Sequence, residues 1–195
     1  VLIIDADERV PEALAREIGD RWSEGEALVG CLALANWAGD AKTVLETQGL
    51  ALRALRESAN RQTLLATLNN LALAAVERLE LDRAEAYLGE AADLSPRVGN
   101  RLADAGLDRA YGYLEESRGA HDLARQRYEA ALDKARRAEV PISIATYLSD
   151  LAWLEVAADR PDAAADRAVE AIAAHQAVGK LGDAVELSGV LAWVE

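Results

Sequence analysis

The sequence repeats itself with a period of 40 residues. The most regular motif is an alanine followed by an apolar residue, at Ala51, Ala91, Ala131 and Ala171. A second motif recurs with the same period, most clearly as Leu151-Ala-Trp-Leu-Glu155 and Leu191-Ala-Trp-Val-Glu195, with Tyr111-Gly-Tyr-Leu-Glu115 as a degenerate copy. A period of roughly 20 to 50 residues is typical of stacked repeats, in which each unit buries its apolar face against its neighbours. The sequence therefore predicts an elongated stack of units and not a single globular core.

Apolar residues within each period recur at intervals of three and four, as in Leu68, Leu71, Ala72, Ala75 and Leu79. This is the pattern of an amphipathic helix that faces a neighbouring helix. Residues that break helices lie between such segments, and some of the helical segments begin with proline. The predicted helices are 24–37, 41–58, 61–79, 82–95 (ending before Pro96), 101–118, 121–138, 141–158, a helix from Pro161 that closes before Gly179, and 181–195. The predicted fold class is all-α, an α-solenoid of antiparallel helical hairpins.

Two regions are expected along the chain: a truncated N-terminal helical segment at 1–22, and the solenoid at 23–195. The expected repeat units are 24–58, 61–98, 101–138, 141–178 and a partial unit at 181–195. Whether residues 1–10 are helical or irregular stays open. The chain contains no Met, opens on Val and stops inside a repeat, so we expect it to be a piece of a longer polypeptide. That last partial unit should expose Leu187, Leu191 and Val194.

The composition excludes several classes of function. A formal net charge of −13 opposes direct binding to nucleic acid, which relies on Lys and Arg to replace counterions. The single cysteine, Cys31, cannot form an internal disulfide and sits at an apolar position of its repeat. No apolar run approaches the roughly 18 residues of a membrane-spanning helix. We therefore expect a cytoplasmic protein without membrane or nucleic-acid contact.

Features of an enzyme are weak in this sequence. His121 and His175 fall in different helices, far from any second metal ligand, and are expected at the surface. No glycine-rich phosphate loop is present, and the acidic pair Glu115-Glu116 is expected on a solvated helix face. We predict a protein without catalytic residues, cofactor or metal.

The spacing resembles the tetratricopeptide repeat, a family built of two antiparallel helices per unit, helix A and helix B. The matching positions are the small residues Ala72, Gly112, Ala152 and Ala192 of helix A, the alanines Ala84, Ala124 and Ala164 of helix B, the recurring alanine named above, and the aromatic Tyr128. The unit is longer than usual, and in this it is similar to variants in kinesin light chains and in the helical regions of large bacterial transcriptional regulators. The stretch Leu68-Asn-Asn-Leu-Ala-Leu73 is similar to both.

This resemblance covers about 24–195 and implies a right-handed superhelix whose A helices line a concave, ligand-binding face. The groove positions carried over from the family are Asn69, Asn70, Leu73, Arg109, Tyr113, Asp150, Trp153 and Trp193. Asn70 is favoured as a contact to a peptide backbone, because an amide both donates and accepts hydrogen bonds. The alternative is that the two asparagines satisfy a helix end or face water.

Tyr113, Trp153 and Trp193 are expected to form an aromatic row across neighbouring A helices, suited to capturing a peptide. The alternative is that these rings pack between adjacent A helices.

The predicted function is a non-catalytic scaffold that binds a protein or peptide on its concave face. The resemblance implies a sensing or inter-domain segment of a larger bacterial regulatory protein. Two alternatives stay open at this point. One is a self-association platform that forms a homodimer. The other is a helical domain appended to an enzyme whose catalytic part lies outside this chain.

Overall fold

The computed structural model describes residues 29–30, 41–57 and 60–194, and within these ranges every regular element is an α-helix. Helices α3 to α10 cover Ala41–Glu57, Arg61–Glu77, Leu81–Val98, Arg101–Ser117, His121–Arg137, Pro141–Ala157, Pro161–Ala177 and Leu181–Val194. The predicted segment 1–22, the predicted helix 24–37 and Cys31 lie outside the described residues.

Most helix starts and ends fall within two residues of the predicted positions, and Pro141 and Pro161 each open a helix as expected. The prediction that a helix ends before Pro96 is wrong. Helix α5 continues through Pro96 to Val98, where Gly99 closes it with a φ of 64° and donates its N–H to the Ser95 carbonyl at 3.1 Å. A proline in the last turn removes only one helical hydrogen bond, so the helix can pass through it.

The turns after α4 to α9 share one backbone device. Each contains a residue with positive φ, and these residues are spaced 20 apart: Leu79, Gly99, Gly119, Glu139, Asp159 and Gly179. In five of the turns the next residue also donates its N–H to a carbonyl five residues back, as from Glu80 to Ala75 at 2.9 Å. This is the Schellman closure of a helix. Packing therefore imposes the same turn even on Leu79 and Glu139, whose side chains disfavour it by about 1–2 kcal/mol.

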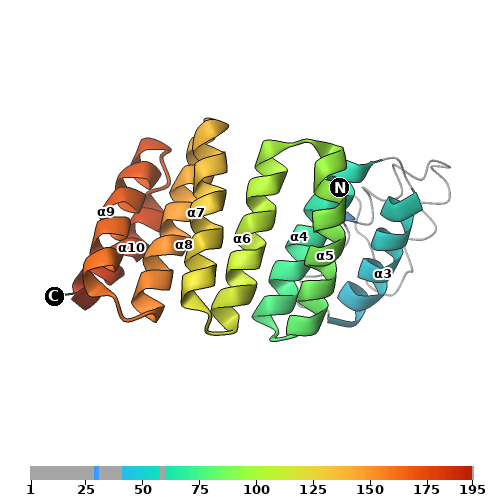
Figure 1. Ribbon diagram of the computed structural model, residues 1–195, viewed down its shortest axis with the longest axis horizontal. Helices are drawn as coiled ribbons and strands as arrows, with labels where there is room; N and C mark the ends of the chain where they lie inside the picture. The colour runs from blue at the N-terminus through green and yellow to red at the C-terminus, as the bar shows by residue number, and fades with distance from the viewer. Residues whose placement is uncertain (1–28, 31–40, 58–59, 195) are drawn as a thin grey trace, which may run out of the picture. The chain divides into compact units, whose positions relative to one another are not determined.

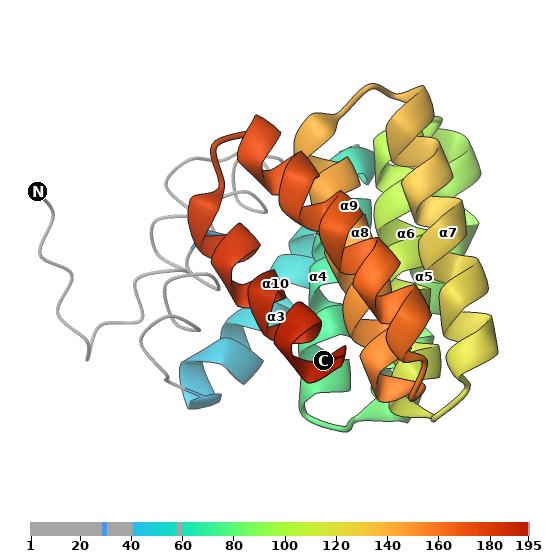
Figure 2. The ribbon, with the colours of Figure 1, turned by 90° about the vertical axis from the view of Figure 1, so that its left-hand side faces the viewer.

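The chain divides into two compact units, Val1–Thr67 and Leu68–Glu195, and the boundary falls inside α4. In the first unit, α3 buries Ala51, Leu52, Ala54 and Leu55. In the second unit, α5, α7 and α9 form one layer and α6, α8 and α10 form the other (Figures 1 and 2). Each helix here packs mainly on its neighbours in sequence, and α8 also contacts α10. Among the described helices, none combines the length and apolarity needed to cross a lipid bilayer.

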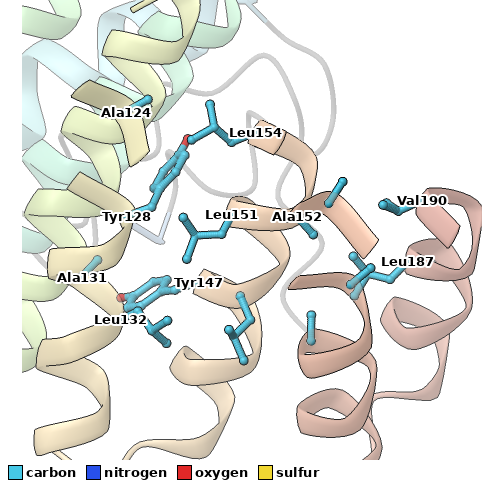
Figure 3. Close-up of a cluster of buried hydrophobic side chains, with 14 of the residues drawn as sticks. Ala124, Tyr128, Ala131, Leu132, Tyr147, Leu151, Ala152, Leu154, Leu187 and Val190 are labelled. Carbon is cyan, nitrogen blue, oxygen red and sulfur yellow. The ribbon is translucent and has the colours of Figure 1, made fainter. Parts of the chain in front are cut away.

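The core of the second unit runs between these two layers (Figure 3). Tyr128 of α7 is fully buried, meets the ring of Tyr113 edge-on at 5.6 Å and donates its hydroxyl to Glu116 at 2.7 Å. Burial raises the pKa of both Tyr128 and Glu116. The expectation that Glu115-Glu116 lies on a solvated face is therefore wrong, because both residues are partly buried and Glu116 accepts a hydrogen bond from the core tyrosine.

The expected exposure of the last helix is also corrected. Leu187 is buried against α8 and α9, and Leu191 and Val194 are partly buried there as well. These residues lie three, four or seven apart and so share one face of α10, which is the face turned to the core. The large apolar side chains that α10 does expose are Leu181, Val185 and Trp193.

The close approach of α6 and α7 can be tested at Gly112. A Cβ added there would lie 2.4 Å from a ring carbon of Tyr128, which cannot move in the packed core. We expect Gly112→Ala to lower the free energy of unfolding by about 1–3 kcal/mol in urea denaturation. The matched control is Gly89→Ala in α5, whose added Cβ meets no atom within 4 Å. It should stabilise the protein by about 0.5–1 kcal/mol, as helical alanine normally does. Equal stabilisation by both changes would contradict the packing described here.

Candidate functional site

A polar cluster joins α6 to α8 on the layer formed by the A helices. Asp150 of α8 is nearly buried and accepts hydrogen bonds from Arg109 of α6 at 2.6 Å (Nε to Oδ2) and 3.1 Å (Nη2 to Oδ1). Tyr113, one helical turn after Arg109, donates its hydroxyl to the same carboxylate at 2.8 Å. Arg109 Nη2 also donates to the Tyr113 hydroxyl oxygen at 3.1 Å, which closes the cluster into a ring. Three of the predicted groove residues thus hold one another in place.

The electrostatics of this cluster fix its protonation. Burial alone would lower the pKa of Arg109, but the hydrogen bond and charge of Asp150 outweigh it and raise that pKa above its ordinary value. Burial, and then the charge of Asp150, raises the pKa of Tyr113, so its hydroxyl keeps the proton it donates. The guanidinium also lies 5.0 Å and 5.9 Å from the ring centroids of Tyr113 and Tyr147. Arg109 is therefore a fixed cation between two rings.

A hollow of about 230 Å³ opens beside the cluster. It is lined by residues of α6, α8, α9 and α10, namely Arg109, Thr146, Ser149, Asp150, Trp153, His175, Asp183, Glu186 and Leu187. Trp153 is 45% exposed, so part of its indole ring is accessible from the hollow. The hollow thus combines a rigid polar floor with one accessible aromatic wall.

His175 contributes a buried imidazole to this hollow, so the prediction that it lies at the surface is wrong. It is 3% exposed, and its Nε2 lies 2.8 Å from Ser149 Oγ. The Ser149 hydroxyl also lies 3.0 Å from the Ala145 carbonyl, which can only accept. Whether Ser149 donates to Nε2 or accepts from Nε2–H depends on the tautomer of the imidazole. Nδ1 of His175 is buried without a hydrogen-bond partner, 3.5 Å from Asp183 Oδ2.

The repeat itself carried a signal for this position. Ala135 and Ser95 lie 40 and 80 residues before His175, and both are buried. Sequence reasoning treated the histidine as an isolated residue and did not apply the register to it.

The remaining predicted groove residues lie outside the hollow. Asn69 is buried near Gly106, and its Oδ1 has no hydrogen-bond partner. Asn70 is exposed, and Trp193 is 45% exposed on α10. The predicted aromatic row is not assembled as three equivalent side chains, because Tyr113 turns to Tyr128 and Asp150 while the two tryptophans stay half-exposed. The structure therefore brings together Arg109, Tyr113, Asp150 and Trp153, and it leaves Asn69, Asn70 and Trp193 apart from them.

A second hollow of about 500 Å³ lies on the layer of the B helices and is almost wholly charged. Buried Glu155 at its base accepts two hydrogen bonds of 2.5 Å from Arg125. Arg167 bridges to Glu129 at 3.4 Å and to Glu170 at 3.8 Å across its rim. The arginine and glutamate side chains are paired with one another here. This hollow therefore offers fewer unpaired polar groups to a ligand than the first. No group of three or more His, Cys, Asp or Glu side chains in the described part of the chain could hold a metal ion.

Comparison with known proteins gives matches in structure and not in sequence. No protein-family model matches, and no curated protein matches either. The crystal structure of aspartyl phosphate phosphatase F from Bacillus subtilis superposes with a TM-score of 0.79 at 12% identity, over 90% of this chain and 46% of that one. The crystal structure of BtubC (BKLC) from P. vanneervenii gives a TM-score of 0.71 at 16% identity, over 95% of this chain and 87% of that one.

These likenesses show the fold alone. The chain is an all-α helical-repeat solenoid, as the 40-residue period predicted. It spans about half the length of the phosphatase chain.

The cluster of Arg109, Tyr113 and Asp150 should also stabilise the fold. Replacing Asp150 with alanine leaves the partly buried Arg109 without its counter-ion, and we expect a loss of about 1–3 kcal/mol in the free energy of unfolding. The control is Glu85→Ala, which removes an exposed partner of Arg118 at 2.6 Å. That change should stay within about 0.5 kcal/mol of the parent protein. Urea denaturation measures both, and equal effects would show that the buried cluster is not stronger than a surface ion pair.

Proposed function

We propose that this chain is a non-catalytic scaffold of tetratricopeptide-like repeats that binds a protein or peptide on the face formed by α6, α8 and α10. The observation that carries the proposal is the half-exposed Trp153 at the rim of a hollow with a rigid polar floor. A tryptophan offers a large contact area with few rotatable bonds, and it is among the residues that contribute most to protein interfaces.

The floor of the hollow supports this reading because it is already ordered. Asp150 is held by Arg109 and Tyr113 through hydrogen bonds of 2.6–3.1 Å. A partner that contacts this floor loses little free energy to immobilising side chains, because these are already fixed. The volume of about 230 Å³ is below the range of roughly 300–1,000 Å³ that holds a whole small molecule. A side chain projecting from a larger partner fits it better.

The residue types of a serine hydrolase occur here as Ser149, His175 and Asp183, but their arrangement favours binding. Ser149 Oγ lies 3.0 Å from the Ala145 carbonyl as well as 2.8 Å from His175 Nε2, so the imidazole is not the sole acceptor within reach of its proton. Ser149 also lies in the middle of α8, where backbone N–H groups are used by the helix and cannot stabilise an oxyanion. We assign the three residues to ligand contact and to packing.

The proposal extends to the biological setting. We propose a sensing or inter-domain segment of a longer bacterial regulatory protein in the cytoplasm, and in support a solenoid of this kind aligns with 46% of a longer chain, that of aspartyl phosphate phosphatase F. Slight changes in the angles between stacked helices can pass a binding event along such a segment. Self-association is the second candidate, favoured by Leu181 and Val185, which α10 exposes by 64% and 71%.

Peptides selected from a random phage-displayed library on the immobilised protein test the scaffold function. We expect Trp153→Ala to weaken the selected peptides by about tenfold or more, since truncating an interface tryptophan costs at least about 1.4 kcal/mol. The control is Leu123→Ala, which removes an exposed apolar side chain from α7 in the other layer. It should leave affinity and helix content unchanged.

Peptide affinities that do not respond to Trp153→Ala would contradict the assignment of this face. Self-association would be favoured instead by two results together. The protein would sediment as a dimer, and peptide binding would be lost only when Val185 is replaced by a charged residue.

A further inference from the structure

The outer face of α10 is apolar and open to solvent, although the inner face already packs on α8 and α9. Leu181, Val185 and Trp193 are exposed there. The other exposed residues of this face are small, namely Gly182, Ser188, Gly189 and Ala192. The two charged residues within Leu181–Val194, Asp183 and Glu186, lie on the side of the hollow. A helix that is apolar on two opposite sides is normally covered on both, so this face points to a further neighbour.

The 40-residue register shows how the same face is covered in the earlier repeats. Ala192 lies 80 residues after Gly112 of α6, which the ring of Tyr128 on α7 covers closely. Val185 lies 40 residues after Ala145 of α8, which is fully buried in a helix that packs on α9. The outer face of α10 therefore has the positions that receive a B helix in the units before it.

The same face also has the spacing with which the B helices pack. In each of α5, α7 and α9, four buried residues follow one another at intervals of four, three and four. These are Ala84, Leu88, Ala91 and Ser95, then Ala124, Tyr128, Ala131 and Ala135, then Ala164, Ala168, Ala171 and His175. The outer face of α10 repeats these intervals with Leu181, Val185, Ser188 and Ala192. One surface that can both receive and replace a B helix is complementary to a second copy of itself.

Val169 of α9 extends the argument beyond α10. Its equivalent 40 residues earlier is Glu129 of α7, which reaches Arg167 of the following B helix at 3.4 Å. Val169 is apolar and exposed where the earlier unit has this charged contact. A helix that lies on α10 as α9 lies on α8 would cover Val169 as well.

We propose that two copies of this chain associate through the outer faces of α10, with the two helices antiparallel about a two-fold axis near Ser188. Val185 of each copy then lies among Ser188, Gly189 and Ala192 of the other, and the axis repeats this contact. A Cβ added at Gly189 would meet no atom of its own chain within 4 Å, so a side chain of the second copy has room there. Small residues at the crossing allow the two helices to approach closely. The inference rests on self-association, the second candidate function above, and assigns it a surface.

The charge of the chain sets how this association responds to salt. Each copy has a formal net charge of −13, so two copies repel each other at low ionic strength. The contact itself contains no charged side chain, and salt therefore screens the repulsion without weakening the attraction. We expect the dimer to become more stable between about 50 mM and about 500 mM NaCl. A dimer held by ion pairs would become less stable over the same range.

Sedimentation equilibrium on the whole chain tests the surface. The contact between two short helices is smaller than a standard interface, so we expect a dissociation constant on the order of 1–100 μM. Val185→Glu should weaken the dimer by about tenfold or more, because each dimer would bury two carboxylates without partners. The control is Leu123→Glu, which adds the same charge at an exposed apolar position of α7 and should change the association by less than about twofold. Both side chains are exposed, so helix content should stay that of the parent chain in each variant.

A short bismaleimide cross-linker tests the orientation of the pair. The single cysteine, Cys31, is first replaced by serine, and one new cysteine is then placed on α10. In an antiparallel pair Ser188→Cys lies near its copy at the axis, whereas Leu181→Cys lies about 20 Å from its copy at a rise of 1.5 Å per residue. We expect cross-linked dimers with Ser188→Cys and few with Leu181→Cys.

Three outcomes would overturn the proposal: a chain that stays monomeric at 500 μM, equal weakening by Val185→Glu and Leu123→Glu, or cross-linking at Leu181→Cys as efficient as at Ser188→Cys. The proposed scaffold fails separately, since its peptides depend on Trp153. A monomer that still binds such peptides would leave the scaffold standing and reject this contact. A dimer that tolerates Val185→Glu would keep self-association and move it to another surface.

Discussion

Small side chains at the helix crossings are the constraint on which this structure depends. Ala84, Ala124 and Ala164 are fully buried at equivalent places in three successive B helices, and Gly112 leaves the space that the Tyr128 ring fills. Where backbones approach this closely, one added methyl group meets a packed wall and must displace it. The recurring alanines thus keep the same short distance between packed helices in each unit. Bulky residues are confined to the few places that these close contacts leave open.

The polar cluster on the A-helix layer is one result of that confinement. Because the core is filled with Ala and Leu, the space between α6 and α8 at Asp150 can hold a carboxylate only if donors reach it from the neighbouring helix. Arg109 and Tyr113 do so from one turn of α6, and they leave the adjacent hollow with ordered walls. Stability and the proposed binding surface therefore share residues here.

The sequence was sufficient for the fold because its signals are local and repeated. Apolar spacing and the prolines at 141 and 161 defined the helices, and the alanine period defined how they stack. The site was harder to predict. Asp150 and Arg109 are 41 residues apart, and no local pattern shows that they are bonded to each other. Leu79 and Glu139 adopt a left-handed turn that their own preferences oppose. His175 was predicted to lie at the surface because most histidines do. Its burial instead matches that of the equivalent positions in the earlier repeats.

The equal spacing of the left-handed turn residues bears on how such a chain can change over time. Helices α6 to α9 are each 17 residues long, and each is followed by the same closure. Because a helix turns about 100° per residue, one residue inserted within a helix would rotate the apolar side chains that follow it in that helix away from their layer. Single-residue changes in length are therefore tolerated best in the turns. Copying or removing a complete hairpin also keeps the apolar face of each helix turned to its neighbours.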